Sequence, residues 1–307
     1  MISERERTRT ARAVLACLSM NLPASAERLH ELTVFLGPVE ALDKLISPST
    51  SAQDRAVYLG AMTVEQLRTR AAAVADATRR AGARVLIPED DDWPERLDDL
   101  SRVPYAAAPS SALCLWARGS GGTFSARTVA ICGSQVASPY GNHVASDLGR
   151  GMADAGWSVA AISGYGIPAA AVRGALAADG RVVMVLSGGI DRPHPQNLNG
   201  LHTQVARTGL LVSAYPPGTT PTRDRATAAG RLLAGMASGA VLVESPLRGR
   251  AIAVTKEAIR RGRRAMVVPG PVTSALSAGT HQVLRDHPQT RLVRDTADIL
   301  AEFPHLR

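Results

Sequence analysis

Cysteine and aromatic residues are scarce in this sequence. Its 307 residues include three cysteines, Cys17, Cys114 and Cys132, which are far apart and form no C-x-x-C pair. Such an odd, scattered set indicates neither a disulfide framework nor a zinc site, and it fits a reducing compartment. Aromatic side chains make up 4% of the chain, so a nucleic-acid site could not rely on many stacking platforms.

Long apolar runs and targeting segments are also missing. No run approaches the roughly 18 apolar residues that a membrane span needs. The N-terminal stretch, MISERERTRT, is charged and lacks the apolar core of a signal peptide. We therefore expect a cytoplasmic protein that has no membrane partner.

The motifs of several enzyme classes do not occur. The chain has no G-x-S-x-G elbow, no G-x-G-x-x-G dinucleotide fingerprint and no Walker-type G-K-[ST]. Its seven histidines form no H-x-x-x-H or H-E-x-x-H pair. We therefore expect no catalytic constellation, no metal site and no cofactor.

Positive charge exceeds negative charge. The 35 Lys and Arg residues against 27 Asp and Glu give a formal net charge of +8. An arginine-rich composition explains this excess without any function, whereas clustered arginines would attract a polyanion. In the most basic segment, residues 248–264, Lys256, Arg260 and Arg263 share one face of a predicted helix and only Glu257 opposes them. A solvated face and a phosphate-tracking stripe are equal alternatives for it.

Residues 1–82 predict a small helical domain. Apolar positions recur at helical spacing over residues 11–46 with a break at Gly37-Pro38, and the charged residues 1–10 are expected to be loose. Thr63 is predicted to begin a further helix as its N-cap, because Gln66 follows at capping-box spacing. That helix is expected to end near Gly82.

Residues 83–128 are interpreted as an extension and linker. Residues 84–88 predict a short strand, residues 112–116 predict an edge strand, and residues 117–128 are rich in Gly and Ser. The acidic trio at 90–92 lacks the glycine and the distal glutamate of a calcium loop, so a solvated turn is favoured over a metal loop.

From residue 129 the chain alternates regularly between apolar runs and helical patterns. The apolar runs occur at residues 129–132, 158–162, 182–186, 210–213, 240–243 and 265–268. Several are continuously apolar, which is typical of strands covered on both faces of a parallel sheet. The pattern predicts an α/β domain over residues 129–307, a Rossmann-like, doubly wound and mostly parallel sheet.

Small-residue turns follow these strands, at the edge where doubly wound sheets bind ligands. The first strand leads through Gly133-Ser134-Gln135 to a helix that starts near Gly141, an arrangement that directs backbone N–H groups and a helix dipole at an anion. Further turns occur at Ser163-Gly164, Ser187-Gly188-Gly189, Pro216-Pro217-Gly218 and Pro269-Gly270. The set predicts a shared phosphate or nucleotide cleft, although tight turns need glycine even without a ligand.

Three residues at this edge of the sheet can be explained either by a structural role or by a chemical one. For Glu244, at the end of one strand, a structural or ligand-binding role is favoured over that of a general base. Asp191 is interpreted as a turn residue. For Cys132, beside the first turn, an inert buried thiol is favoured over a reactive one.

Longer motifs also follow one another in a specific order between Val85 and Arg285. They are Asp92-Trp93-Pro94-x-x-Leu97, Val129-Ala130-Ile131-x-Gly133-Ser134, Ser138-Pro139-Tyr140-Gly141, Arg173-Gly174-Ala175-Leu176, Gly189-Ile190-Asp191-Arg192-Pro193-x-Pro195-x-Asn197, Ser213-x-Tyr215-Pro216-Pro217-Gly218 and Val268-Pro269-Gly270-Pro271. In this order they resemble the signature of the DNA-processing protein A (DprA/Smf) family. The helical leader is similar to the SAM or helix-hairpin-helix leaders of some members.

The resemblance implies a protein that binds single-stranded DNA, forms a homodimer through its Rossmann-like domain and loads a RecA-type recombinase during DNA uptake and transformation. It implies no cofactor and no defined catalysis. The residues expected to contact DNA or phosphate are Gly133, Ser134, Gln135, Ser163, Gly164, Tyr165, Gly166, Arg173, Arg231, Arg250, Lys256 and Gly270.

The sequence departs from the family at positions where that family contacts DNA. Gln135 replaces an arginine of the first turn, and of a later arginine-rich run only Arg231 is kept. The Arg, Asp and His of the second turn are replaced by Tyr165, Pro168 and Val172. Each lost charged contact removes about 1.5–3 kcal/mol.

Three functions therefore remain open. The first is a divergent DprA-like single-stranded-DNA-binding protein. The second is a nucleotide-binding sensor or LOG-type phosphoribohydrolase of the wider superfamily, although the P-G-G-x-G-T-x-x-E motif of those enzymes is absent. The third is a degenerate member that acts as a protein-interaction module.

Overall fold

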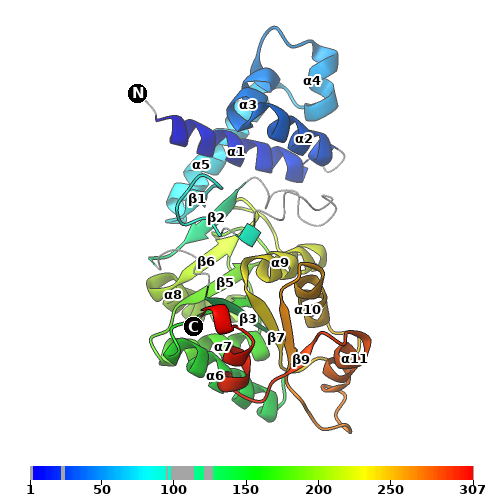
Figure 1. Ribbon diagram of the computed structural model, residues 1–307. Helices are drawn as coiled ribbons and strands as arrows, with labels where there is room; N and C mark the ends of the chain where they lie inside the picture. Colours follow the sequence, from blue (N-terminus) through cyan, green and yellow to red (C-terminus); the bar gives the residue numbers. More distant parts are fainter. Residues whose placement is uncertain (1–2, 22–24, 95, 98–113, 121–126, 307) are drawn as a thin grey trace.

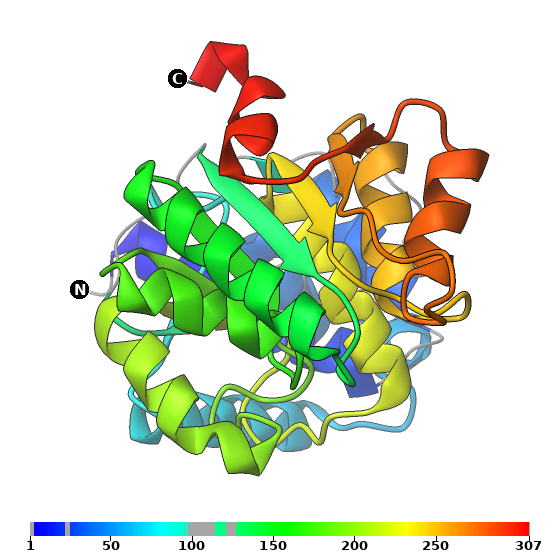
Figure 2. The same cartoon turned by 90° about the horizontal axis from the view of Figure 1, so that it is seen from below.

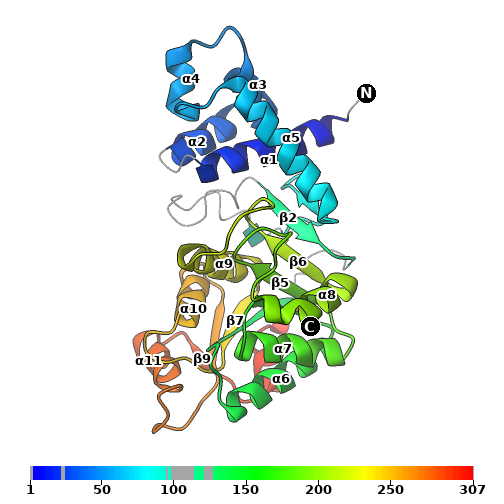
Figure 3. The same cartoon turned by 180° about the vertical axis from the view of Figure 1, so that it is seen from behind.

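The computed structural model describes residues 3–21, 25–94, 96–97, 114–120 and 127–306 (Figure 1). A group of N-terminal helices lies against one end of a larger α/β unit, next to strands β1 and β2 (Figures 1 and 3). Within the described ranges, no helix combines the length and the apolar character needed to cross a bilayer.

The N-terminal group contains α1 (Glu4–Asn21), α2 (Ala26–Leu36), α3 (Pro38–Ile46), α4 (Ala52–Leu59) and α5 (Val64–Arg80). The predicted break separates α2 from α3 at Gly37, whose φ of 80° lies in the left-handed region that favours glycine. The capping box that begins α5 is confirmed, with Thr63 and Gln66 bonding each other's backbone N–H. The short helix α4 was not predicted.

The expectation that residues 1–10 are loose is wrong, because α1 begins at Glu4. The arginines of this helix pair with the acidic segment after β1: Arg9 Nη2 lies 2.6 Å from Asp90 Oδ1, and Arg12 Nη2 lies 2.5 Å from Glu89 Oε1. The side chain of Asp90 is only 8% exposed and also accepts a hydrogen bond from the backbone N–H of Ile87. Glu89 and Asp90 therefore form an ion-paired clasp with α1, whereas Asp91, whose side chain is 94% exposed, has the solvated position that the sequence favoured for the trio.

The predicted fold class is confirmed by a nine-stranded sheet in the order β1-β2-β6-β5-β4-β3-β7-β8-β9. Strands β3 to β9 run parallel, whereas β2 is antiparallel to both β1 and β6. The strands are β1 (Arg84–Leu86), β2 (Leu115–Arg118), β3 (Thr128–Cys132), β4 (Ser158–Ile162), β5 (Val182–Leu186), β6 (Leu210–Ser213), β7 (Gly239–Leu242), β8 (Arg264–Val267) and β9 (Arg291–Leu292).

Strands β1 and β2 come from the segment interpreted as extension and linker. By pairing with β6, β2 joins the main sheet and covers the backbone edge that β6 would otherwise expose. The predicted edge strand at 112–116 corresponds to β2, which begins at Leu115; residues 112–113 lie outside the described residues.

Helices cover both faces of the sheet (Figure 2). They are α6 (Pro139–Asp154), α7 (Ile167–Ala177), α8 (Asn199–Thr208), α9 (Arg223–Met236), α10 (Ala251–Arg260), α11 (Ala278–Asp286) and α12 (Thr296–Ala301). In β3, Val129 and Ile131 belong to the core with α6, α7 and α8, whereas Ala130 and Cys132 belong to the core with α9, α10 and α11. This burial on both faces explains why the strand is continuously apolar.

The strand order reverses between β3 and β7. From β3 the chain builds outward through β4 and β5 to β6, and it then crosses back to place β7 on the other side of β3. The carboxyl ends of β3 and β7 therefore flank the topological switch point, where open α/β sheets bind their ligands.

Candidate functional site

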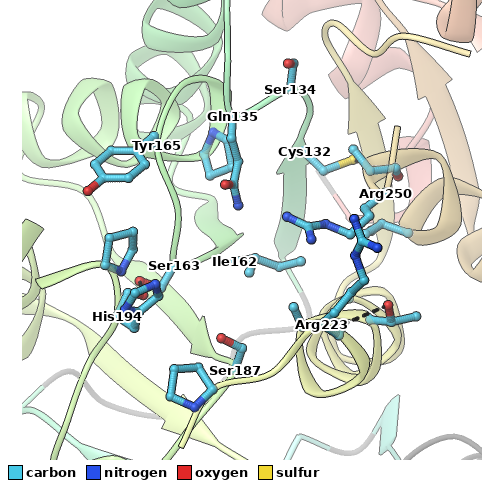
Figure 4. A pocket seen from close by; sticks show the side chains of 18 of the residues that line it. Cys132, Ser134, Gln135, Ile162, Ser163, Tyr165, Ser187, His194, Arg223 and Arg250 are labelled. Carbon is cyan, nitrogen blue, oxygen red and sulfur yellow. Dashed lines mark hydrogen bonds between the residues drawn. The ribbon is translucent and has the colours of Figure 1, made fainter. Parts of the chain in front are cut away.

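A cavity of about 920 Å³ opens beside this switch point. It is lined by the loops that follow β3, β4 and β5, by residues 219–223 that lead into α9, and by residues 245–254 that lead into α10 (Figure 4). Of the five turns predicted to share a cleft, those at Gly133-Ser134, Ser163 and Ser187 contribute to the cavity, whereas Pro216-Pro217-Gly218 and Pro269-Gly270 are not part of its lining.

The cavity gathers part of the predicted contact set. The predicted residues that line it are Gly133, Ser134, Gln135, Ser163, Tyr165 and Arg250. Gly164 and Gly166 lie just behind this lining, because a Cβ on Gly164 would come within 2.9 Å of Gln135 Nε2 and one on Gly166 within 2.5 Å of the Ser134 carbonyl oxygen. The remaining predicted residues, which are not part of the lining, are Arg173 on α7, Arg231 on α9, Lys256 on α10 and Gly270 after β8.

The N-terminus of α6, which the sequence marked as an anion site, holds a carboxylate of the chain itself. Glu244, at the end of β7, is 3% exposed and accepts hydrogen bonds from the backbone N–H of Ser138 at 3.0 Å and from its hydroxyl at 2.5 Å. The helix dipole stabilises a negative charge in this position. Glu244 thus has the structural role that the sequence favoured.

The turn after β3 is largely committed to internal contacts. The backbone N–H of Ser134 donates to the Glu244 carbonyl at 2.7 Å, its carbonyl accepts from Ile167 N, and its hydroxyl donates to the Val136 carbonyl. The exposed side chain of Gln135 extends over Gly164 toward the cavity (Figure 4). Gln135 is therefore the polar group of this turn that can serve a ligand.

Arg223 and Arg250 form a cationic side of the cavity. Arg223 is the first residue of α9 and Arg250 is the N-cap of α10, and both guanidinium groups point into the cavity (Figure 4). Neither guanidinium donates a hydrogen bond to, or pairs with, any residue that the structure describes. Because the positive ends of two helix dipoles add to two positive side chains, this region favours an anion.

The opposite side of the cavity is partly apolar and carries one charged side chain, that of Arg192, which is 78% exposed and whose Nε lies 3.6 Å from Asp191 Oδ2. Tyr165, which is 41% exposed, and His194 also belong to this side (Figure 4). Pro168, Pro193 and Pro195 complete this side. His194 and Arg192, which also line the cavity, were not among the predicted contacts, although both belong to the Gly189–Asn197 motif.

A buried histidine behind the cavity orders two of its loops. The hydroxyl of Ser163 lies 2.6 Å from the His194 carbonyl and 2.7 Å from His202 Nε2. His202, on α8, is 1% exposed, and burial together with the positive charge of Arg118 lowers its pKa from 6.5 to about 4. The neutral imidazole therefore fixes Ser163 relative to the loop after β5. No sequence motif pointed to His202.

Cys132 lies on the floor of the cavity as an unreactive thiol. It is buried against α10, with Sγ 4.0 Å from Thr255 Oγ1, and burial raises the pKa of the thiol to about 12. Within the described ranges, no group of three or more His, Cys, Asp and Glu residues is placed to hold a metal ion.

Part of the basic segment 248–264 stabilises the fold. Arg260 and Arg261 both pair with Glu257, whose side chain is buried, and Arg263 donates to the Arg96 carbonyl at 3.0 Å. These contacts account for much of the predicted stripe. Lys256 is exposed on α10 outside the cavity lining.

Together, the doubly wound parallel sheet and the cavity at its switch point, with its cationic side, define a Rossmann-like α/β protein. Residues 84–304 match the family described as DNA recombination-mediator protein A. The chain belongs to this DprA/Smf family of DNA-processing recombination mediators.

Individual relatives agree with this assignment. The chain is 38% identical to the DNA processing protein DprA of Mycobacterium tuberculosis over 299 residues, which cover 96% of this chain and 75% of that protein. The fold is similar to that of Streptococcus pneumoniae DprA, with a TM-score of 0.72 at 20% identity over 98% of both chains. It is also similar to DprA of Helicobacter pylori, with a TM-score of 0.61 at 20% identity over 72% of this chain and 95% of that one; that structure was described for its single-stranded-DNA-binding mode.

Proposed function

We propose that this chain binds single-stranded DNA in the cavity at the switch point and acts as a recombination mediator. The observation that carries the proposal is the charge of the lining: among the described residues its ionised side chains are Arg192, Arg223 and Arg250, with no carboxylate. A cavity of one sign attracts a phosphate backbone. The single-stranded-DNA binding described for the Helicobacter pylori relative supports single-stranded DNA as the ligand.

This charge pattern disfavours the phosphoribohydrolase alternative. Cleavage of a glycosidic bond generally uses carboxylic side chains as acid, base or nucleophile. Glu244, the carboxylate that the sequence placed at this edge, is buried at the N-terminus of α6 and bonded to Ser138. We therefore favour nucleic-acid binding over glycosidic-bond hydrolysis as the function of this cavity.

The partners proposed for this activity follow from family membership. They are a RecA-type recombinase that receives the bound strand and a second copy of this chain in a homodimer. The setting would be the cytoplasm, during DNA uptake and recombination.

A salt-titrated binding assay tests the proposal. Anisotropy of a 5′-labelled oligothymidylate should show binding that weakens as salt rises, because displaced counterions are released from the DNA. Replacing both cavity arginines (Arg223→Gln with Arg250→Gln) should reduce the slope of log K against log salt by about 1.4, since each single-strand phosphate contact contributes ~0.7. Arg173→Gln, on α7 outside the cavity lining, is the matched control and should leave the slope unchanged.

Absence of binding at low salt would contradict the proposal and favour the interaction-module alternative. Binding that the double replacement leaves intact would move the DNA site elsewhere. Release of ribose phosphate from nucleoside monophosphates would support the hydrolase alternative instead.

A further inference from the structure

A second cavity lies where the sheet ends, next to strand β1 (Figure 1). Strand β1 is the terminal strand of the sheet, and among the described strands it pairs with β2 alone. The cavity has a volume of about 630 Å³ and is bounded by α1, by α5 and by four consecutive residues, 83–86. This volume lies within the range of ligand pockets. The second cavity shares no lining residue with the cavity at the switch point.

The backbone of β1 directs a donor and an acceptor toward its free edge. Ala83 donates its backbone N–H to the Thr78 carbonyl at 3.0 Å. Ile87 donates its own to Asp90 Oδ2 at 3.0 Å, so neither group is directed at β2. Alternate residues of a strand direct their backbone groups to the same side. The N–H and C=O of Val85, which lies between these two residues and lines the cavity, therefore point away from β2.

The wall of the cavity that α1 and α5 provide is apolar. Val85 packs against the hydrophobic core that includes residues of both helices. A residue paired directly opposite Val85 would place its side chain on the same face of the sheet, in the space beside these helices. The apolar side chains there are small or of medium size, namely Ala13, Val14 and Cys17 of α1 and Ala71, Val74 and Ala75 of α5.

The charged side chains around the cavity already have partners. They are Arg9, which pairs with Glu6 and Asp90, Arg84, which pairs with Asp92, and Arg79, which pairs with Asp76. The switch-point cavity differs, because its Arg223 and Arg250 have no partner among the described residues. The second cavity therefore favours neither an anion nor a cation, and an uncharged ligand is complementary to it.

We propose that the second cavity binds a short uncharged segment of another protein in the extended conformation. The segment pairs with β1 as an additional strand and places a β-branched side chain beside Val85, between α1 and α5. Extended peptides add to sheet edges through backbone hydrogen bonds, while pockets for alternate side chains provide specificity. A helix would leave the backbone groups of Val85 unpaired, because its own backbone bonds are internal. This site is independent of the proposed DNA binding.

A blocked model peptide tests the proposal. The uncharged peptide acetyl-TTVTT-amide is added to the ¹⁵N-labelled full chain, and the backbone amide resonances are followed by NMR. The resonances of residues 83–87 should shift and saturate with a Kd of about 1 mM or lower. The same peptide with an N-methyl group on its valine should bind about tenfold more weakly or worse, because it lacks the donor that pairs with Val85.

Two matched variants of α5 locate the site. Ala75 and Ala72 are both exposed, but only Ala75 lines the second cavity. Ala75→Trp fills the cavity and should weaken peptide binding at least about tenfold, whereas Ala72→Trp should bind the peptide like the wild type. Neither residue lines the switch-point cavity, so both variants should bind an oligothymidylate as the wild type does.

The outcomes that overturn the proposal are distinct. Equal binding of the two peptides would show that the cavity accepts side chains without strand pairing. Saturable binding that Ala75→Trp leaves intact would place the peptide elsewhere, and no shift at millimolar peptide would mean that the edge takes no strand. If the peptide does not bind but the chain forms a dimer that Ala75→Trp disrupts, the occupant is a second copy. Failure to bind DNA leaves this site intact, so the two proposals fail separately.

Discussion

The carboxylate of Glu244 accepts hydrogen bonds from both the backbone N–H and the hydroxyl of Ser138, at 3.0 and 2.5 Å. This contact joins the end of β7 to the start of α6 across the switch point. The carboxylate thus occupies the N-terminus of α6, the position where the sequence predicted a phosphate. The positive charge that no carboxylate of the described chain neutralises therefore lies at the N-termini of α9 and α10, at Arg223 and Arg250.

The close approach of Glu244 requires a glycine at position 141. A Cβ on Gly141 would lie 2.2 Å from Glu244 Oε2, so Gly141→Ala must displace the buried carboxylate. We expect a loss of about 1–3 kcal/mol in the free energy of unfolding, because a charged hydrogen-bonded group loses its partners. Urea denaturation followed by circular dichroism measures it.

Gly200→Ala is the matched control for this substitution. Gly200 lies in α8, and a Cβ at this position would meet no atom within 4 Å, so alanine should be neutral or stabilising by up to about 1 kcal/mol. Equal stability of Gly141→Ala and the wild type would show that Glu244 can leave α6 without cost.

The buried imidazole of His202 should make stability depend on pH. Its pKa is lowered from 6.5 to about 4 in the folded state, so the unfolded chain takes up a proton more readily. The contribution of His202 to stability is therefore fully present above pH 6.5 and is lost as the pH falls from 6.5 toward 4. Below pH 4 this group causes no further change. At 1.36 kcal/mol per pKa unit the full loss is about 3 kcal/mol.

His202→Gln separates this effect from the titration of carboxylates. Glutamine can place a polar atom near the position of Nε2 and bond Ser163, but it does not titrate. Urea midpoints measured from pH 7 to pH 4 should fall less steeply in the variant than in the wild type. Parallel pH profiles would show that another group causes the acid sensitivity.

The ion pair between Arg9 and Asp90 should couple the N-terminal helices to the sheet. Asp90 is nearly buried, Arg9 is partly buried, and Arg9 Nη2 lies 2.6 Å from Asp90 Oδ1. A double-mutant cycle with Arg9→Ala and Asp90→Ala should give a coupling energy of about 1 kcal/mol or more, since desolvated pairs are screened less than surface pairs.

The pair of Arg79 with Asp76, within α5, provides the comparison. Both side chains are well exposed, and surface pairs of this kind contribute about 0.3–0.5 kcal/mol. A coupling at Arg9 and Asp90 no larger than this would mean that the clasp does not hold the two parts of the chain together.

The cavity arginines should oppose stability in the absence of a ligand. Each places a cation at a helix N-terminus, so Arg223→Gln and Arg250→Gln should each raise the free energy of unfolding slightly, on the order of 0.3 kcal/mol. Arg173→Gln should change it by less. Thermal unfolding at low salt, where charge effects are largest, measures the difference. A loss of stability in both cavity variants would contradict the idea that these cations await an anion.

Much of the fold follows from local patterns. The continuous apolar run of β3 reports burial on two faces, and the Thr63–Gln66 spacing reports a capping box, because both depend on neighbours within a few residues. The helices α4, α11 and α12 and the two-residue strand β9 were not predicted, since they are short and carry few periodic positions. The ion-paired start of α1 was missed because the partners of Arg9 and Arg12 are 81 and 77 residues away.

Periodicity and small-residue turns are properties of neighbouring residues, so local patterns were enough to predict the doubly wound sheet and the family signature. Which polar groups at the carboxyl edge of the sheet are already bonded within the chain depends on long-range packing. Glu244 bonds Ser138, 106 residues away, and His202 bonds Ser163, 39 residues away. Polar groups near the first two turns are thus bonded within the chain, whereas the guanidinium groups of Arg223 and Arg250 have no partner among the described residues. Such pairings depend on where distant strands end in space, which no local pattern encodes.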